Sequence, residues 1–255
     1  MTFEENSENY LRSLGELFKY LSRSSVIASQ ASQSVPILGR LYSQTQSAVG
    51  RFNRPVQLSI DPNLHIPIDP RLVCSEVGRA DLFFGGEINF ADRRLQSQAL
   101  AITITFRPEK EIAAADGIPA MGANKNHVVR RFHFDFDSAL KDGDRPINHF
   151  QYGGDFNAVY LNSCPYASDG FQYSLMREMD NPRLPIPPAD PGSLMDAILH
   201  QFGGSLRPIA GDGQWVKVVS DIEKIWLKDY FEAALREINK GVRKDTLYKH
   251  FCKEI

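Results

Sequence analysis

Two stretches near the N-terminus place apolar residues at steps of three and four, which is the spacing of an amphipathic helix. The first stretch carries its apolar residues at Tyr10, Leu14, Leu17, Phe18 and Leu21. The second carries them at Ile37, Leu38, Leu41, Tyr42, Ala48, Val49 and Phe52. The pattern predicts two antiparallel helices over residues 4–22 and 35–52. The opposite face of the second helix is rich in Ser and Gln, and it faces either solvent or a partner helix.

Alternation of apolar and polar residues marks strands in the middle of the chain. Residues 82–90 and 99–106 alternate in this way, and the link between them suits a hairpin. Residues 131–137 alternate with phenylalanine, and residues 147–152 are typical of a return strand. Together these segments predict an antiparallel sheet of about four to six strands. Repeated prolines within residues 55–78 predict an extended, turn-rich connection there.

The last third of the chain returns to a helical pattern after a proline-rich connector over residues 181–191. We expect Ser193 to cap one helix, and the Ser220 to Glu223 segment to cap the longest one. A short helix would hold Leu247, Tyr248 and Phe251. Helices from both ends of the sequence are expected to cover the same face of the sheet.

The sequence therefore predicts an α+β fold, an antiparallel sheet flanked by an N-terminal helical hairpin and C-terminal helices. We expect a single domain over residues 1–255, made of the hairpin (1–54), the sheet region (55–180) and the C-terminal helical region (181–255). A chain of this length buries a sufficient core without disulfides or structural metals.

Charge and cysteine content narrow the class of protein. The chain has 29 basic and 31 acidic residues, a net charge of −2, so there is no overall attraction to nucleic acid or anionic membranes. Residues 1–54 hold 6 basic and 4 acidic groups, so a basic surface would be local to the ends. The three cysteines form no CxxC pair, which excludes a zinc ribbon or thioredoxin motif. The acidic N-terminus lacks signal-peptide features, so we expect a cytoplasmic protein without a membrane segment.

Most of the candidate catalytic and binding residues lie on the strand that contains three phenylalanines. Alternate side chains of a strand share a face, so Arg131, His133, Asp135 and Asp137 lie opposite Phe132, Phe134 and Phe136. The return strand puts His149 and Gln151 on one face, and a hairpin can bring His149 near Asp135 or His133. The three phenylalanines themselves belong to the core, or form a platform on which bases stack.

Imidazole and carboxylate groups in this arrangement suggest a metal site or an acid/base pair. His133, Asp135 and His149 are the candidate catalytic residues, and Glu87 could join them as a fourth ligand from a neighbouring strand. Such a set suits Mg²⁺, Mn²⁺ or Zn²⁺, and a bound divalent metal ion could activate water for phosphodiester hydrolysis. A metal-free pair with His133 or His149 as the base is the second interpretation. Arg131, Asp137 and Gln151 are the candidate binding residues.

The same pattern has a simpler interpretation, a polar sheet face exposed to solvent and held by ion pairs. Motifs for phosphate loops, dinucleotides, HExxH zinc sites and serine hydrolases are absent, so no standard catalytic class is indicated. A catalytic cluster, a binding surface and a solvated face therefore stay open.

Three segments together resemble a pattern found in other proteins. They are the strand at 132–137, the segment from Pro146 to Gly154, and the connector from Pro182 to Pro188 before a helix. Over about residues 127–203 they resemble a pattern in uncharacterised bacterial proteins, some of which accompany defence or mobile-element genes. The resemblance implies a bacterial or phage origin, and it assigns no role to any single residue.

Two functional classes follow. The first is a subunit or accessory protein of a bacterial antiviral defence or nucleic-acid-processing assembly, acting by protein or nucleic-acid binding. Its partner would be another protein or a second copy of the chain, with nucleic acid as an alternative and no membrane. The second class is a metal-dependent phosphodiesterase or nuclease that uses the His/Asp cluster.

Overall fold

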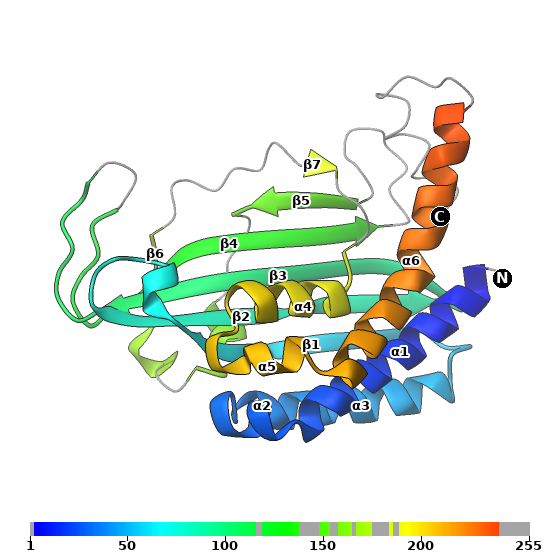
Figure 1. The fold of residues 1–255 in the computed structure, drawn as a ribbon, viewed down its shortest axis with the longest axis horizontal. Coiled ribbons are helices and arrows are strands. Elements are labelled where there is room, and N and C mark those ends of the chain that lie inside the picture. Colours follow the sequence, from blue (N-terminus) through cyan, green and yellow to red (C-terminus); the bar gives the residue numbers. More distant parts are fainter. Residues whose placement is uncertain are drawn as a thin grey trace.

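The computed structural model describes residues 3–115, 119–137, 148–153, 158–164, 167–174, 184–185 and 189–239. In this part of the chain a mostly antiparallel sheet carries helices from both ends of the sequence on one face (Figure 1). The α+β class predicted from the sequence is confirmed. None of the helices described is both long and apolar enough to cross a membrane.

The N-terminal helices are α1 (Phe3–Arg23), α2 (Ser25–Gln30) and α3 (Ser34–Val49). The two longer ones confirm the predicted hairpin, because the apolar residues at helical spacing are the ones that are buried. Helix α2 was not predicted. Ser24 caps its N-terminus, because the Ser24 hydroxyl oxygen accepts a hydrogen bond from the backbone N–H of Ile27.

Strand β1 (Val56–Ile68) replaces the turn-rich connection expected over residues 55–78. That expectation was wrong in kind, because the prolines exclude a helix but are tolerated in a strand at the edge of a sheet. The pairing of β1 with β2 shifts register between Ile60 and Leu64, which absorbs Pro62. A short turn, η1 (Pro70–Leu72), follows.

The clearest prediction, a hairpin of two long strands, is confirmed. Strands β2 (Gly78–Ala91) and β3 (Arg94–Pro108) pair along their whole length. The two residues between them, Asp92 and Arg93, have φ angles of 50° and 60°. Two residues with positive φ are typical of the tight turns that match the twist of paired strands.

The sheet continues through β4 (Asn126–Asp137) and β5 (Asn148–Tyr152), in the order β1-β2-β3-β4-β5-β7. Strand β7 (Leu184–Pro185) pairs with β5, and β6 (Phe171–Tyr173) runs parallel to the start of β4. Between these strands lie the short turns η2 (Ala158–Leu161) and η3 (Ala167–Asp169).

The C-terminal elements are α4 (Pro191–Gln201), η4 (Gly204–Leu206), α5 (Arg207–Ala210) and α6 (Gly213–Asn239). The number of long helices was predicted, but both predicted caps were wrong. Asp190 caps α4, and Ser193 is the third residue of that helix, where it completes the capping box. Ser220 lies inside α6, which begins at Gly213, because Asp212 accepts hydrogen bonds from the backbone N–H groups of Gln214 and Trp215. The predicted helix around residues 247–251 and most of the connector lie outside the described residues.

One hydrophobic core joins the N-terminal helices, the sheet and the C-terminal helices. Both helical ends therefore cover the same sheet face, as the sequence predicted. A hydrogen-bonded chain fixes this arrangement: the hydroxyl of Tyr10 donates to Oε1 of Gln98 at 2.6 Å, and Nε2 of Gln98 donates to the carbonyl of Ala189. A second, smaller core of Phe83, Leu161 and Cys164 lies on the opposite face.

Candidate functional site

The predicted polar face of β4 forms as expected. Phe132, Phe134 and Phe136 lie on the side of the helices, where the first two pack against the main core and Phe136 belongs to it. Alternate side chains of a strand point to opposite faces, so His133 and Asp135 lie on the other side. The candidate residues are therefore kept apart from the phenylalanines, as the sequence pattern indicated.

The hairpin of β4 and β5 brings one predicted pair together. Asp135 pairs with His149 in the sheet register, and Nε2 of His149 lies 3.2 Å from Oδ2 of Asp135. His133, two residues before Asp135 on β4, lies opposite Gln151 of β5. An imidazole beside a carboxylate is the arrangement of an acid/base pair, so His149 and Asp135 are the part of the predicted cluster for which that role stays a prediction.

The wider cluster does not form a metal centre in the structure. Glu87 lies in the same row as Asp135, but Ala99 of β3 stands between them. Two strand spacings separate residues 87 and 135 by about 10 Å. Among the residues that the structure describes, no three His, Cys, Asp or Glu side chains are grouped as metal ligands. One carboxylate and one imidazole give two ligands, fewer than the three protein ligands of a typical catalytic zinc site.

The interpretation of this face as solvated is wrong for three of the seven candidate residues, whereas His133, Asp135 and Asp137 are half-buried and Glu87 is exposed. Arg131, His149 and Gln151 are 5%, 4% and 6% exposed, whereas the Asp135 side chain keeps 27% of its surface exposed. Nη1 of Arg131 donates to Oγ1 of Thr103 on the next strand at 2.6 Å. A buried guanidinium with a hydrogen-bonded neighbour is a structural feature, because its removal leaves polar groups without partners in a dry environment.

Two further buried histidine contacts were missed at the sequence level. Nε2 of His65 lies 2.6 Å from Oδ1 of Asp81, both side chains are buried, and the His65 ring stacks on Phe83. His65 belongs to β1, which was predicted as a connection, so the face of its side chain was not assigned. The alternation of His65 with Leu64 and Ile66 was the signal that could have revealed it.

The other missed contact joins β4 to the residue after β6. The Ser174 hydroxyl lies 2.8 Å from Nδ1 of His127, and Nε2 of His127 lies 3.2 Å from the carbonyl of Gly122. A carbonyl only accepts, so Nε2 carries the proton and Nδ1 accepts from Ser174. Burial lowers the pKa of His127, which fits a neutral ring that holds β4, β6 and the preceding loop together.

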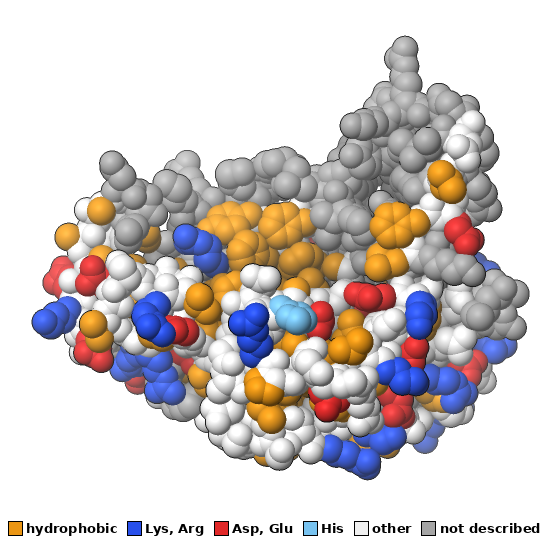
Figure 2. All heavy atoms as spheres, in the orientation of Figure 1, with side chains coloured by type: hydrophobic (Ala, Val, Ile, Leu, Met, Phe, Trp, Pro, Cys, Tyr) orange, Lys and Arg blue, Asp and Glu red, His pale blue; other side chains and the backbone are white. Residues whose placement is uncertain are grey.

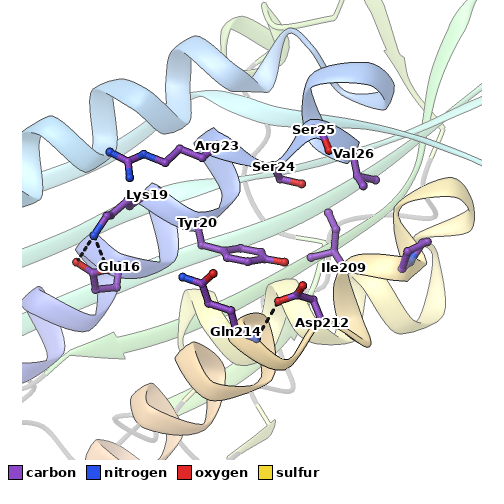
Figure 3. Close-up of a pocket in the computed structure, with 11 residues that line it drawn as sticks. Glu16, Lys19, Tyr20, Arg23, Ser24, Ser25, Val26, Ile209, Asp212 and Gln214 are labelled. Carbon is purple, nitrogen blue, oxygen red and sulfur yellow. Dashed lines mark hydrogen bonds and ion pairs between the residues drawn. The ribbon is translucent and has the colours of Figure 1, made fainter.

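A pocket of about 530 Å³ lies between α1, α2 and the start of α6 (Figure 3). Tyr20 reaches from α1 towards Asp212, and its ring packs 5.7 Å from that of Trp215. Burial and the charge of Asp212 raise the pKa of Tyr20 to about 12, so the phenol stays protonated. The Lys19 charge is matched by Glu16 at 2.9 Å. The contact of Tyr20 with Asp212 and Trp215 joins α1 to the start of α6.

An aromatic surface lies on the helix side of β4 and β5. It consists of Phe132, Phe134, Phe150 and Tyr152, all of which are half-buried. Phe132 lies 5.8 Å from Phe150 and 5.6 Å from Tyr152, and Phe134 lies 5.4 Å from Phe150, measured between ring centres. Figure 2 shows a hydrophobic area on this part of the sheet, above α4. The described helices leave these four rings partly exposed, although they bury the same face of β1 to β3.

Comparison with known proteins gives no match for this chain among family models, curated proteins or solved structures. The resemblance to bacterial defence-associated proteins therefore stays a prediction.

Proposed function

We propose that the protein is a non-catalytic subunit of a larger assembly, and that it binds a protein partner through the aromatic surface of Phe132, Phe134, Phe150 and Tyr152. The observation that carries the proposal is the clustering of four half-buried rings on the helix side of the sheet. A folding chain buries large aromatic residues wherever it can, since each contributes a large apolar area. Rings that together keep part of their surface exposed are typical of a binding surface.

The neighbourhood of this surface supports a protein as the occupant. Aromatic residues are enriched at the centres of protein interfaces, where charged residues are depleted. Phe231 and Leu235, one helical turn apart on α6, are 55% and 58% exposed, and they offer a second apolar strip. Figure 2 shows hydrophobic side chains on the sheet and on the projecting part of α6 on one face of the molecule. A partner that covers both would bury two apolar areas on the same face of the molecule.

A photo-crosslinking experiment tests this proposal. A benzophenone amino acid at position 150 is expected to crosslink one defined protein in the native host. The same group at Val77, an exposed hydrophobic residue outside the aromatic surface, is not expected to capture that protein. The captured protein is then purified, and its affinity is measured with Phe150→Ser and with Val77→Ser as the matched control.

Loss of at least about tenfold in affinity with Phe150→Ser alone supports the interface, since central aromatic residues dominate binding energy. Equal binding by wild type and Phe150→Ser overturns it. If the captured protein is an enzyme that acts on nucleic acid, the result also supports the predicted nucleic-acid-processing assembly.

The metal-dependent phosphodiesterase is a second candidate, favoured by the distance of 3.2 Å between His149 and Asp135. Hydrolysis of an activated phosphodiester is measured with Mg²⁺, Mn²⁺ and Zn²⁺, comparing wild type with Asp135→Asn. Metal-dependent turnover that disappears in the variant would establish the enzyme. Turnover that persists in Asp135→Asn, or none in wild type, excludes a catalytic role for this pair.

A further inference from the structure

A groove of about 490 Å³ runs between α3 and the beginning of β1, away from the aromatic surface. Three arginines line it, Arg40 from α3 and Arg51 and Arg54 from the segment after α3, together with serine and glutamine side chains. No described residue that lines the groove is acidic. The chain as a whole has more acidic than basic residues, so this is a local concentration of positive charge.

Arg51 and Arg54 are exposed, and neither forms an ion pair with a carboxylate among the residues that the structure describes. Arg40 is held in place by the sheet: its Nη2 atom donates to the carbonyls of Ser59 at 3.2 Å and Asp61 at 2.6 Å. Carbonyl oxygens orient the guanidinium but do not neutralise it, and the group keeps further N–H donors. The groove therefore has three positive charges without a counter-charge in its lining.

Helix polarity explains only part of this arrangement. Basic residues near the C-terminus of a helix interact favourably with its dipole, and Arg51 and Arg54 follow the end of α3. Arg40 lies in the middle of α3, beyond the reach of that effect. The dipole also gives no reason for the serine and glutamine donors that separate the arginines.

We propose that this groove binds the phosphate backbone of a nucleic acid. Arginine is the preferred partner of phosphate because its planar fork donates two parallel hydrogen bonds. Serine and glutamine side chains and arginines commonly contact phosphate oxygens, without reading sequence. The inference goes beyond the proposed protein interface and rests on a different surface, so either can fail alone.

An acidic peptide is a weaker fit than a nucleic acid. A peptide would gain most by adding a strand to the free edge of β1. Side chains of α3 already form hydrogen bonds with backbone groups at that edge. Arg40 donates to the carbonyls of Ser59 and Asp61, and the Ser34 hydroxyl pairs with both the N–H and the carbonyl of His65. Little of the strand edge is left for pairing, whereas the charges remain accessible.

Fluorescence anisotropy with labelled oligonucleotides tests the proposal on the full chain. Three phosphate contacts predict a slope of log K against log salt of about −2 to −3 between about 50 and about 200 mM salt, for single strands and duplexes respectively. The test variant is Arg51→Glu with Arg54→Glu. The control is Arg23→Glu with Arg207→Glu, two exposed arginines outside the groove that change the net charge equally.

The groove variant is expected to lose at least about tenfold in affinity and to show a shallower salt slope, whereas the control loses less than about threefold. Circular dichroism melts check that both variants fold, and Arg51→Gln with Arg54→Gln replaces the groove variant if it does not. Conservative Arg51→Lys with Arg54→Lys is expected to retain part of the binding. Equal losses in the groove variant and the control, no binding by wild type, or equally effective competition by polyglutamate overturns the assignment.

Discussion

Asp190 is both a helix cap and a buried acid. Its Oδ1 atom accepts from the backbone of Gly192 at 2.7 Å and Ser193 at 3.0 Å, and its side chain is buried. Burial raises its pKa from 3.8 to about 6, although these hydrogen bonds act in the opposite direction. The carboxyl therefore holds its proton to a higher pH in the folded protein than in the unfolded chain.

This difference makes folding stability depend on pH. A raised carboxyl pKa favours the folded state below about pH 4 and loses that contribution as the pH rises through about 6. A gap of about two units corresponds to about 3 kcal/mol. Asp190→Asn keeps an oxygen for the cap but cannot ionise, so we expect it to be at least as stable as wild type at pH 7.

Urea denaturation of both proteins at several pH values measures the effect. The stability of wild type relative to Asp190→Asn is expected to fall by about 3 kcal/mol between pH 4 and pH 7. A constant difference across that range would contradict the prediction.

The second residue-scale prediction concerns the buried face of the sheet. His149 is 4% exposed, so His149→Ala removes a packed ring beside Asp135 and is expected to cost about 1–3 kcal/mol. Glu87→Ala, in the same row but exposed, is expected to change stability by less than about 0.5 kcal/mol. The free energy of unfolding is measured for both. Equal, small effects would mean that His149 has no structural role.

Strand β4 shows how one element divides its phenylalanines between folding and binding. Phe136 is 7% exposed in the main core, whereas Phe134 is half-buried in the aromatic surface. We expect Phe136→Ala to cost about 3–5 kcal/mol and Phe134→Ala clearly less. Denaturant unfolding of the two variants compares them directly, and an equal loss would mean that Phe134 is a core residue.

At the element scale, the N-terminal helices are inseparable from the sheet. Tyr10, Leu14, Leu17 and Leu21 are fully buried in the shared core. A chain lacking residues 1–54 would expose the apolar face of the sheet, so we expect it not to fold. Limited proteolysis and circular dichroism of residues 55–255 test this. A protease-resistant fragment with a cooperative melt would show that the helices are an independent attachment.

Helices and hairpins were predicted where a local pattern decides the structure, and missed where a distant contact does. The alternation at Leu100 to Phe106 predicted β3, whereas the prolines of β1 obscured the short alternation around His65, and its pairing with β2 makes it a strand. The two predicted N-caps were wrong for a related reason. Ser193 and Ser220 have the right residue type, but Asp190 and Asp212 lie where the backbone N–H groups are free.

At the scale of the whole molecule, the pattern of two strands predicted that His149 lies near Asp135 or His133, and the register of the sheet selects Asp135. The sequence left open whether solvent reaches this face. Burial of Arg131 and Gln151 depends on what covers the second face, and no local alternation encodes that. The arginine groove was missed because its residues come from a helix, a loop and an unpredicted strand.

The contact between α1 and α6 has a consequence for the synthesis of the chain. Tyr20 emerges from the ribosome early, and Trp215, on which its ring packs, follows 195 residues later. At about 5–20 residues per second this interval lasts about 10–40 s. Helix α3 covers part of α1 soon after it is made, but the side of α1 that meets α6 stays uncovered until Trp215 has been made. During that time the apolar face of α1 is exposed in the nascent chain, and we expect chaperones that bind nascent chains to cover it.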